Sequence, residues 1–184
     1  MRRFLLAILV LFLVATPVFA LSTDEEPSAA STSGTTVQKS DYILVYPGIL
    51  PNNPLYGIKM IRDKIILLLI TDPTKKIKFN LIQSDKRLGA GIMLWESDHS
   101  RVEDAIETIS KGQNYFASAV ADTNKLTGEG RDTSGLRNDL VKAAQKHKEV
   151  LDEWIKKVPE KNKPMAKALS ARINAFRLQV EGLN

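Results

Sequence analysis

The chain has 184 residues and a formal net charge of +5, and 43% of its residues are hydrophobic while 26% are charged. These values are ordinary for one globular domain with a core of its own. The chain contains no cysteine, which excludes a disulfide framework, thiol chemistry and a cysteine-based metal site.

The N-terminus has the layout of a secretory signal peptide over residues 1–20. Arg2 and Arg3 precede an unbroken apolar run that ends at Val18-Phe19-Ala20. No cysteine follows the predicted cut, so a lipid-anchored lipoprotein is excluded. The alternative is an uncleaved anchor, for which the apolar run is slightly short. We therefore expect a secreted or extracytoplasmic protein, which is membrane-anchored if the signal stays uncleaved.

Two segments without helix are expected next. Residues 21–41 are rich in Ser, Thr, Ala and acidic residues and contain almost no large apolar side chain, which predicts a disordered spacer. Residues 42–53 are predicted to form an extended lead-in, because Pro47 and Pro51 fix their own φ and favour extended geometry in the residues before them. The β-prone residues at its start are too isolated to build a sheet. We expect this strap to lie on the helices.

A first helix is predicted over residues 54–70, with Asn53 as its cap and Pro54 at its first position. Its apolar residues recur at three- and four-residue steps, which is typical of a helix that needs a partner surface. They are Leu55, Ile58, Ile61, Ile65 and Leu68. Residues 65–70 are apolar on all sides, which indicates either a buried core helix or an exposed docking surface. The core interpretation is favoured.

A second helix is predicted over residues 73–97, where Asp72 is the expected cap and Pro73 occupies the first position. Its first half carries a run of charged residues: Lys75, Lys76, Lys78, Asp85, Lys86 and Arg87. Gly89 and Gly91 follow, and each costs a helix about 0.8 to 1 kcal/mol relative to alanine. They indicate either a close approach of another helix or a bend.

Three more helices are predicted over residues 101–126, 135–158 and 164–181. A capping box from Ser100 to Glu103 opens the first of them. The second has nearly heptad spacing of apolar residues, which favours antiparallel bundle packing. The predicted fold class is therefore all-α, a helical bundle of about five helices with an N-terminal proline-rich extended strap.

The strap and the first two helices share a string of spaced motif residues. They are Pro47, Pro51, Pro54, Leu55, Tyr56, Lys59, Arg62, Asp63, Asp72, Pro73, Lys75, Lys76, Asp85, Lys86 and Arg87. This string resembles a prokaryotic family of secreted or extracytoplasmic helical domains of unknown function, also seen as the outer module of anti-sigma-like membrane proteins. The resemblance covers roughly residues 47–88. It implies that the motif residues are candidates for interaction, and it implies no chemistry.

The sequence offers little support for catalysis. It lacks Gly-x-Ser-x-Gly and Ser-x-x-Lys patterns and has two histidines. His147 lies on the apolar face of its helix, where a half-buried, hydrogen-bonded histidine is expected. His99 lies beside Asp98 and not far from Glu103, so that a metal-dependent hydrolase is the alternative at that point. We expect no catalytic residue, no metal site and no cofactor.

Positive charge is concentrated between Lys59 and Arg87, where eight Lys or Arg residues face three Asp residues. One interpretation pairs these acids with the motif cations, so that the pairs tie the first two helices together. The pairs would join Arg62 to Asp63, Lys76 to Asp72 and Arg87 to Asp85. The remaining lysines would then be available to a partner; they are Lys59, Lys64, Lys75, Lys78 and Lys86.

These observations predict a non-enzymatic binding domain of the cell envelope. The expected partner is an unidentified envelope protein, in a protein–protein interaction or a sensing role. The alternative is a charge-driven binder of anionic lipid or cell-wall polymer, whose binding salt would weaken. Nucleic acid is not expected, because no stacking aromatic residues interleave the lysines.

Overall fold

The computed structural model describes residues 40–182, which form a helical bundle. The predicted signal peptide and almost all of the predicted spacer lie outside these residues. The described part contains no strand, and the predicted all-α class with five helices is confirmed. The helices are α2 (Tyr56–Leu69), α3 (Pro73–Ser97), α4 (Val102–Gly128), α5 (Ser134–Lys157) and α6 (Lys163–Glu181), with the short 3₁₀ helices η1 (His99–Arg101) and η2 (Glu160–Asn162) between them.

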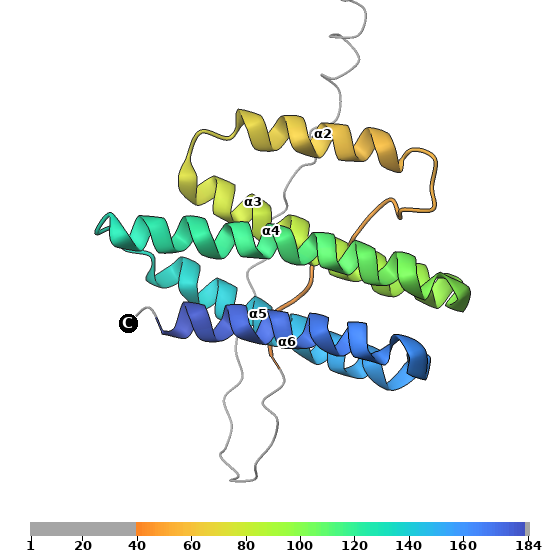
Figure 1. The fold of residues 1–184 in the computed structure, drawn as a ribbon. Helices are drawn as coiled ribbons and strands as arrows, with labels where there is room; N and C mark the ends of the chain where they lie inside the picture. Colours follow the sequence, from red (N-terminus) through yellow and green to blue (C-terminus); the bar gives the residue numbers. More distant parts are fainter. Residues whose placement is uncertain (1–39, 183–184) are drawn as a thin grey trace, which may run out of the picture. The chain divides into compact units, whose positions relative to one another are not determined.

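Two helix pairs build the core. Helix α3 packs along α4, and α5 packs along α6, in the stacked arrangement that Figure 1 shows. Short connections place consecutive helices antiparallel, so that the apolar stripes of both pairs meet. Leu94, Ile109, Phe116, Leu151 and Ile173 are among the fully buried residues of this core.

Glycine allows α3 and α4 to approach closely. A Cβ atom on Gly91 would lie 2.6 Å from Ile109 Cγ1 and 2.8 Å from the carbonyl oxygen of Ala105. A Cβ atom on Gly89 would instead lie 3.3 Å from Cδ of Pro47 in the strap. Helix α3 runs without interruption through both positions, so close approach is the correct one of the two interpretations.

Hydrogen bonds define how α3 and α4 begin. Asp72 caps α3, since its Oδ1 accepts hydrogen bonds from the backbone N–H groups of Thr74 at 2.8 Å and Lys75 at 3.4 Å. The predicted capping box of α4 is wrong. Ser100 lies inside η1, where both its N–H and its hydroxyl donate to Asp98 Oδ1, so that no side chain caps α4 itself.

Helix α2 begins later than its proline suggests. It starts at Tyr56, and the cap position is Leu55, which makes no side-chain capping bond. Asn53 closes the preceding turn instead, because its Oδ1 accepts from the N–H of Leu55 at 2.9 Å. The prediction that Asn53 caps this helix is therefore wrong. No helix within residues 40–182 combines the length and hydrophobicity needed to cross a membrane.

Candidate docking surface on helix α2

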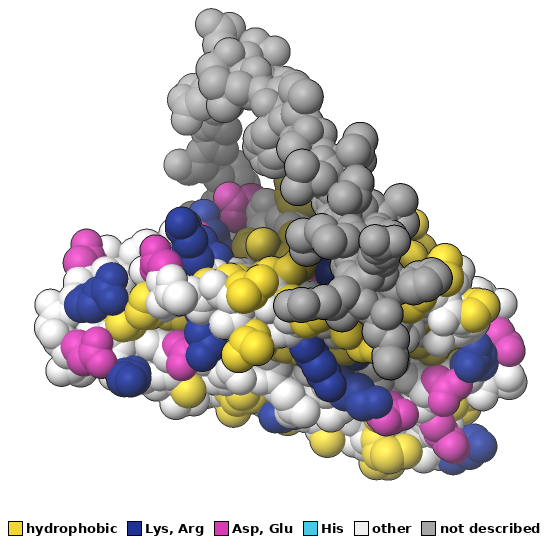
Figure 2. Space-filling view, turned by 90° about the horizontal axis from the view of Figure 1, so that it is seen from above, with side chains coloured by type: hydrophobic (Ala, Val, Ile, Leu, Met, Phe, Trp, Pro, Cys, Tyr) yellow, Lys and Arg dark blue, Asp and Glu magenta, His cyan; other side chains and the backbone are white. Residues whose placement is uncertain are grey.

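Helix α2 exposes its apolar residues. Figure 1 shows it on the side of the α3–α4 pair that faces away from α5 and α6, and α2 packs closely against none of the other helices. We define the α2 outer face as its exposed large apolar residues: Leu55, Ile58, Ile61, Ile65, Ile66, Leu68 and Leu69. Figure 2 looks onto this side of the molecule and shows hydrophobic side chains beside Lys and Arg side chains.

The side of α2 opposite to the outer face, here called the inner side, carries the most deeply buried polar residue of this helix. Asp63 is only 3% exposed, and its Oδ1 accepts two hydrogen bonds from the neighbouring Arg62, at 2.7 and 3.0 Å. Tyr56 and Met60 share this inner side and are half-buried. Helix α2 is therefore amphipathic, but its apolar side is exposed and its buried side carries a charged residue.

The core interpretation of residues 65–70 is thus wrong. Ile65, Leu68 and Leu69 are exposed, and Leu68 is 84% exposed. The physical reason is that α3 and α4 already bury their apolar stripes against each other and against the α5–α6 pair. Among the described residues, the stripe of α2 is not covered by any of these four helices.

Motif residues hold α2 in place on its inner side. The ammonium group of Lys59 donates to the carbonyl oxygens of Pro47 at 2.7 Å and Ile49 at 3.3 Å, which ties α2 to the strap. Burial lowers the pKa of this ammonium. The guanidinium of Arg87 donates to Met60 Sδ at 2.7 Å and lies 5.7 Å from the centre of the Tyr56 ring.

The region around Arg87 forms a small pocket of about 190 Å³, lined in part by Pro51 and Tyr56. Arg87 is 7% exposed, and its guanidinium also lies 5.7 Å from the centre of the Tyr115 ring on α4. Burial raises the pKa of Tyr56, against the opposing effect of Arg87. The contact with Arg87 of α3 makes Tyr56 an anchor of α2. The roles of Met60 and Tyr115 were missed in the sequence, because only the fold brings them to Arg87.

Asp85 belongs to the core and not to the surface. It is fully buried, and its Oδ1 lies 2.7 Å from Nε2 of His147 on α5. The hydroxyl of Tyr42 in the strap donates to its Oδ2 at 2.8 Å. Burial, followed by the negative charge of Asp85, raises the pKa of Tyr42 above its ordinary range. His147 is fully buried rather than half-buried, and its expected hydrogen bond is present.

The expected pairing of motif cations with motif acids is therefore largely wrong. Only Arg62 and Asp63 pair, and both belong to α2, so the pair does not tie two helices together. Asp72 is occupied by the cap of α3, and Asp85 by His147. Lys76 and Arg87 are left without a carboxylate partner among residues 40–182.

Of the five lysines expected to be available to a partner, Lys59 is held by the strap, and that expectation is wrong for it. The other four, together with Lys76, carry positive charge without an ion pair in the described range. Lys64, Lys75, Lys76 and Lys78 are exposed, and Lys86 is half-buried. None of them makes an ion pair with another residue of the described range. Since Asp63 and Asp85 are buried, Asp72 is the exposed acid between residues 59 and 87. The surface charge of this stretch is positive.

The alternative metal site does not assemble. Asp98 Oδ1 accepts hydrogen bonds from Ser100, which lower the pKa of Asp98, and the ring of His99 lies 4.4 Å from that of Trp95. Within residues 40–182 no group of three His, Asp or Glu side chains is placed to hold a metal ion.

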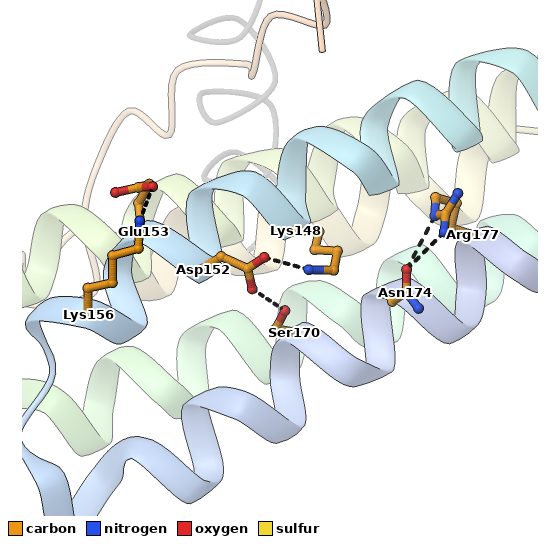
Figure 3. A network of polar contacts seen from close by, with 7 residues as sticks. All are labelled: Lys148, Asp152, Glu153, Lys156, Ser170, Asn174 and Arg177. Atoms are coloured by element: carbon orange, nitrogen blue, oxygen red, sulfur yellow. Dashed lines mark hydrogen bonds and ion pairs between the residues drawn. The ribbon is translucent and has the colours of Figure 1, made fainter. Parts of the chain in front are cut away.

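A polar network joins α5 and α6 on another part of the bundle, as Figure 3 shows. Asp152 accepts hydrogen bonds from Lys148 at 2.5 Å and from the Ser170 hydroxyl at 2.6 Å. Burial by itself would raise the pKa of Asp152, but these two hydrogen bonds together with the positive charges of Lys148 and Lys156 lower it. The network connects α5 to α6, and we assign it a structural role.

Comparisons with known proteins give one match. A family model described as a domain of unknown function, DUF5667, matches residues 48–161. This range includes α2 and its outer face. No curated protein and no solved structure matches the chain.

Proposed function

Because the chain belongs to the DUF5667 family, whose description assigns no activity, we propose a function from the geometry: a non-enzymatic binding domain that docks through the α2 outer face. We further propose that it works outside the cytoplasm, at the cell envelope. The signal-like layout of residues 1–20 supports this location.

The exposure of the α2 outer face carries the proposal. Seven of the thirteen exposed large hydrophobic residues within the described range lie between positions 55 and 69. Single exposed apolar residues are normal on soluble proteins, but a contiguous group of them marks an interaction surface. The charged side chain that α2 does bury, Asp63, faces the bundle, so that the helix is oriented to present its apolar side.

The non-enzymatic part of the proposal is supported by where the reactive side chains lie. His147 and Asp85 are 2% and 0% exposed, so that no substrate reaches them without unfolding the core. His99 lies on the surface but has no assembled set of partners in the described range. General acid–base catalysis needs a titratable group within hydrogen-bond reach of a bound substrate, and neither histidine offers this arrangement.

The experiment is a pull-down from the envelope fraction with three forms of the protein as bait. The test variant combines Ile61→Asp, Ile65→Asp and Leu68→Asp. The control variant combines Met165→Asp and Leu178→Asp, which change exposed apolar residues of α6. We expect the wild type and the control to retain the same envelope component through a low-salt wash, and the test variant to lose it. Equal retention by all three would refute docking through α2.

A further inference from the structure

We infer that the α2 outer face docks on an anionic lipid surface, with α2 lying in the plane of the membrane. This inference rests on the proposed function and names the partner class. Three properties of the described residues point to lipid: the chemistry of the face, the charge around it, and the attachment of α2 to the bundle.

The α2 outer face is purely aliphatic. It consists of Ile and Leu side chains, which offer no hydrogen bond and no aromatic edge to a protein partner. Cores of protein–protein interfaces are enriched in Tyr, Trp and Arg, and the energetically dominant residues are mostly of these types. A hydrocarbon layer requires only apolar area, so the composition of this face fits lipid better than a specific protein pocket.

The charge around the face is mainly positive, and Asp72 is the exposed acid between residues 59 and 87. Lys64 lies on α2, and Lys75, Lys76 and Lys78 follow on the first turns of α3, all exposed and without an ion pair in the described range. The neighbouring carboxylates of Asp63 and Asp85 are buried. Anionic headgroups attract such lysines, whose long aliphatic stems can lie along apolar surface while the ammonium reaches the headgroups. Lysine is depleted in protein interfaces, which again favours lipid.

The geometry of α2 requires an in-plane orientation. The helix has 14 residues, too few for the roughly 20 that span a bilayer. Its inner side is fastened to the bundle through Lys59, Met60 and Tyr56, so that its outer face can enter the interfacial region without uncovering the core. A helix with one apolar side and basic residues beside it is the form that lies on a membrane; here Lys64 is on α2 and the other exposed lysines are on α3.

The absence of cysteine allows a direct test with the full chain. A single cysteine is introduced as Leu68→Cys, or as Leu178→Cys for the control, and labelled with an environment-sensitive fluorophore. Emission is measured with vesicles of phosphatidylcholine alone and of phosphatidylcholine mixed with phosphatidylglycerol. A label at position 68 reports contact between α2 and the bilayer, and this signal does not depend on whether residues 1–20 also bind the bilayer.

We expect the label at position 68 to shift to the blue with phosphatidylglycerol vesicles and not with phosphatidylcholine alone, while the label at position 178 stays unchanged. Replacing Lys64, Lys75, Lys76 and Lys78 by Glu should lower the fraction of position-68 label in contact with these vesicles by more than about tenfold. An unchanged label at position 68, or an equal shift with both vesicle types, would overturn the inference.

A second measurement separates failure of the inference from failure of the proposed function. The same labelled protein is titrated with unlabelled full chain and, separately, with detergent-extracted envelope protein. A shift at position 68 with either of these, but not with vesicles, would overturn the lipid inference and leave docking through α2 intact. No shift under any condition would overturn both.

Discussion

Ile61 and Asp63, two residues apart in α2, lie on opposite sides of the helix: the isoleucine is 62% exposed and the aspartate 3% exposed. A helix that folds only to complete a core places these two residues the other way round. Asp63 is neutralised by Arg62 next to it, while Ile61 has no partner surface among the described residues. The orientation of α2 is therefore the feature that its function has to explain.

Replacing Ile61 by Ser should leave the stability of the domain nearly unchanged. An exposed side chain away from caps and pairs alters the free energy of unfolding by no more than about 0.5 kcal/mol. Ile109→Ala, in the core, should cost about 2 to 5 kcal/mol. Urea unfolding of both variants checks this contrast. A large loss for Ile61→Ser would show that α2 folds through this face.

The cap of α3 should be measurable in the same way. Asp72→Ala removes the acceptor for the N–H groups of Thr74 and Lys75 and should cost about 0.5 to 2 kcal/mol. Asp72→Asn keeps a side-chain oxygen and serves as the control, with a much smaller loss. Thermal melts of the two variants distinguish them, and identical melts would remove the capping role.

Two glycines should respond to alanine with opposite signs. Gly91→Ala would place a Cβ atom 2.8 Å from the carbonyl oxygen of Ala105, and such overpacking should cost about 1 to 3 kcal/mol. At Gly57 in α2 a Cβ atom would meet nothing within 4 Å, so alanine should stabilise the helix by up to about 1 kcal/mol. Urea unfolding measures both. Equal responses would contradict the close crossing of α3 and α4.

The Tyr42 hydroxyl should make stability depend on alkaline pH. Its pKa is raised above the ordinary value of 10.0 by burial and by Asp85. The folded state therefore favours the neutral phenol. This contribution is fully present below pH 10 and is lost as the pH rises towards the higher pKa of the folded state.

Tyr42→Phe removes both the titration and the hydrogen bond to Asp85. It should lower the free energy of unfolding at neutral pH by about 1 to 3 kcal/mol, since Asp85 Oδ2 loses its partner. It should also flatten the decline above pH 10 relative to the wild type. Tyr46→Phe is the control, because Tyr46 is 70% exposed. Equal alkaline profiles for wild type and Tyr42→Phe would contradict the role of Tyr42.

Much of the bundle could be predicted from local signals in the sequence. Asp72 followed by Pro73 marks the beginning of α3, and the helices appear as stretches of apolar periodicity, because caps and periodicity are properties of neighbouring residues. The sequence also predicts the hydrogen bond of His147, because a polar group on the apolar face of a helix needs a partner.

The side of α2 that faces outward could not be predicted in this way. An apolar stripe shows that a helix has surface to bury, and it does not show whether the rest of the chain supplies a partner. The pairing of Asp85 has the same difficulty, because its partner His147 lies 62 positions away. Local charge spacing therefore suggested Arg87 as its partner, whereas the fold places Arg87 near the rings of Tyr56 and Tyr115.

The most direct test of docking through α2 is the rate at which a thiol at position 68 reacts with a maleimide in the intact envelope. Leu68→Cys is compared with Leu178→Cys, each in purified protein and in the envelope fraction. The account predicts that position 68, which is 84% exposed in the structure, reacts rapidly in purified protein and is strongly protected in the envelope, while position 178 reacts equally in both. Equal reactivity of position 68 in the two preparations would contradict it.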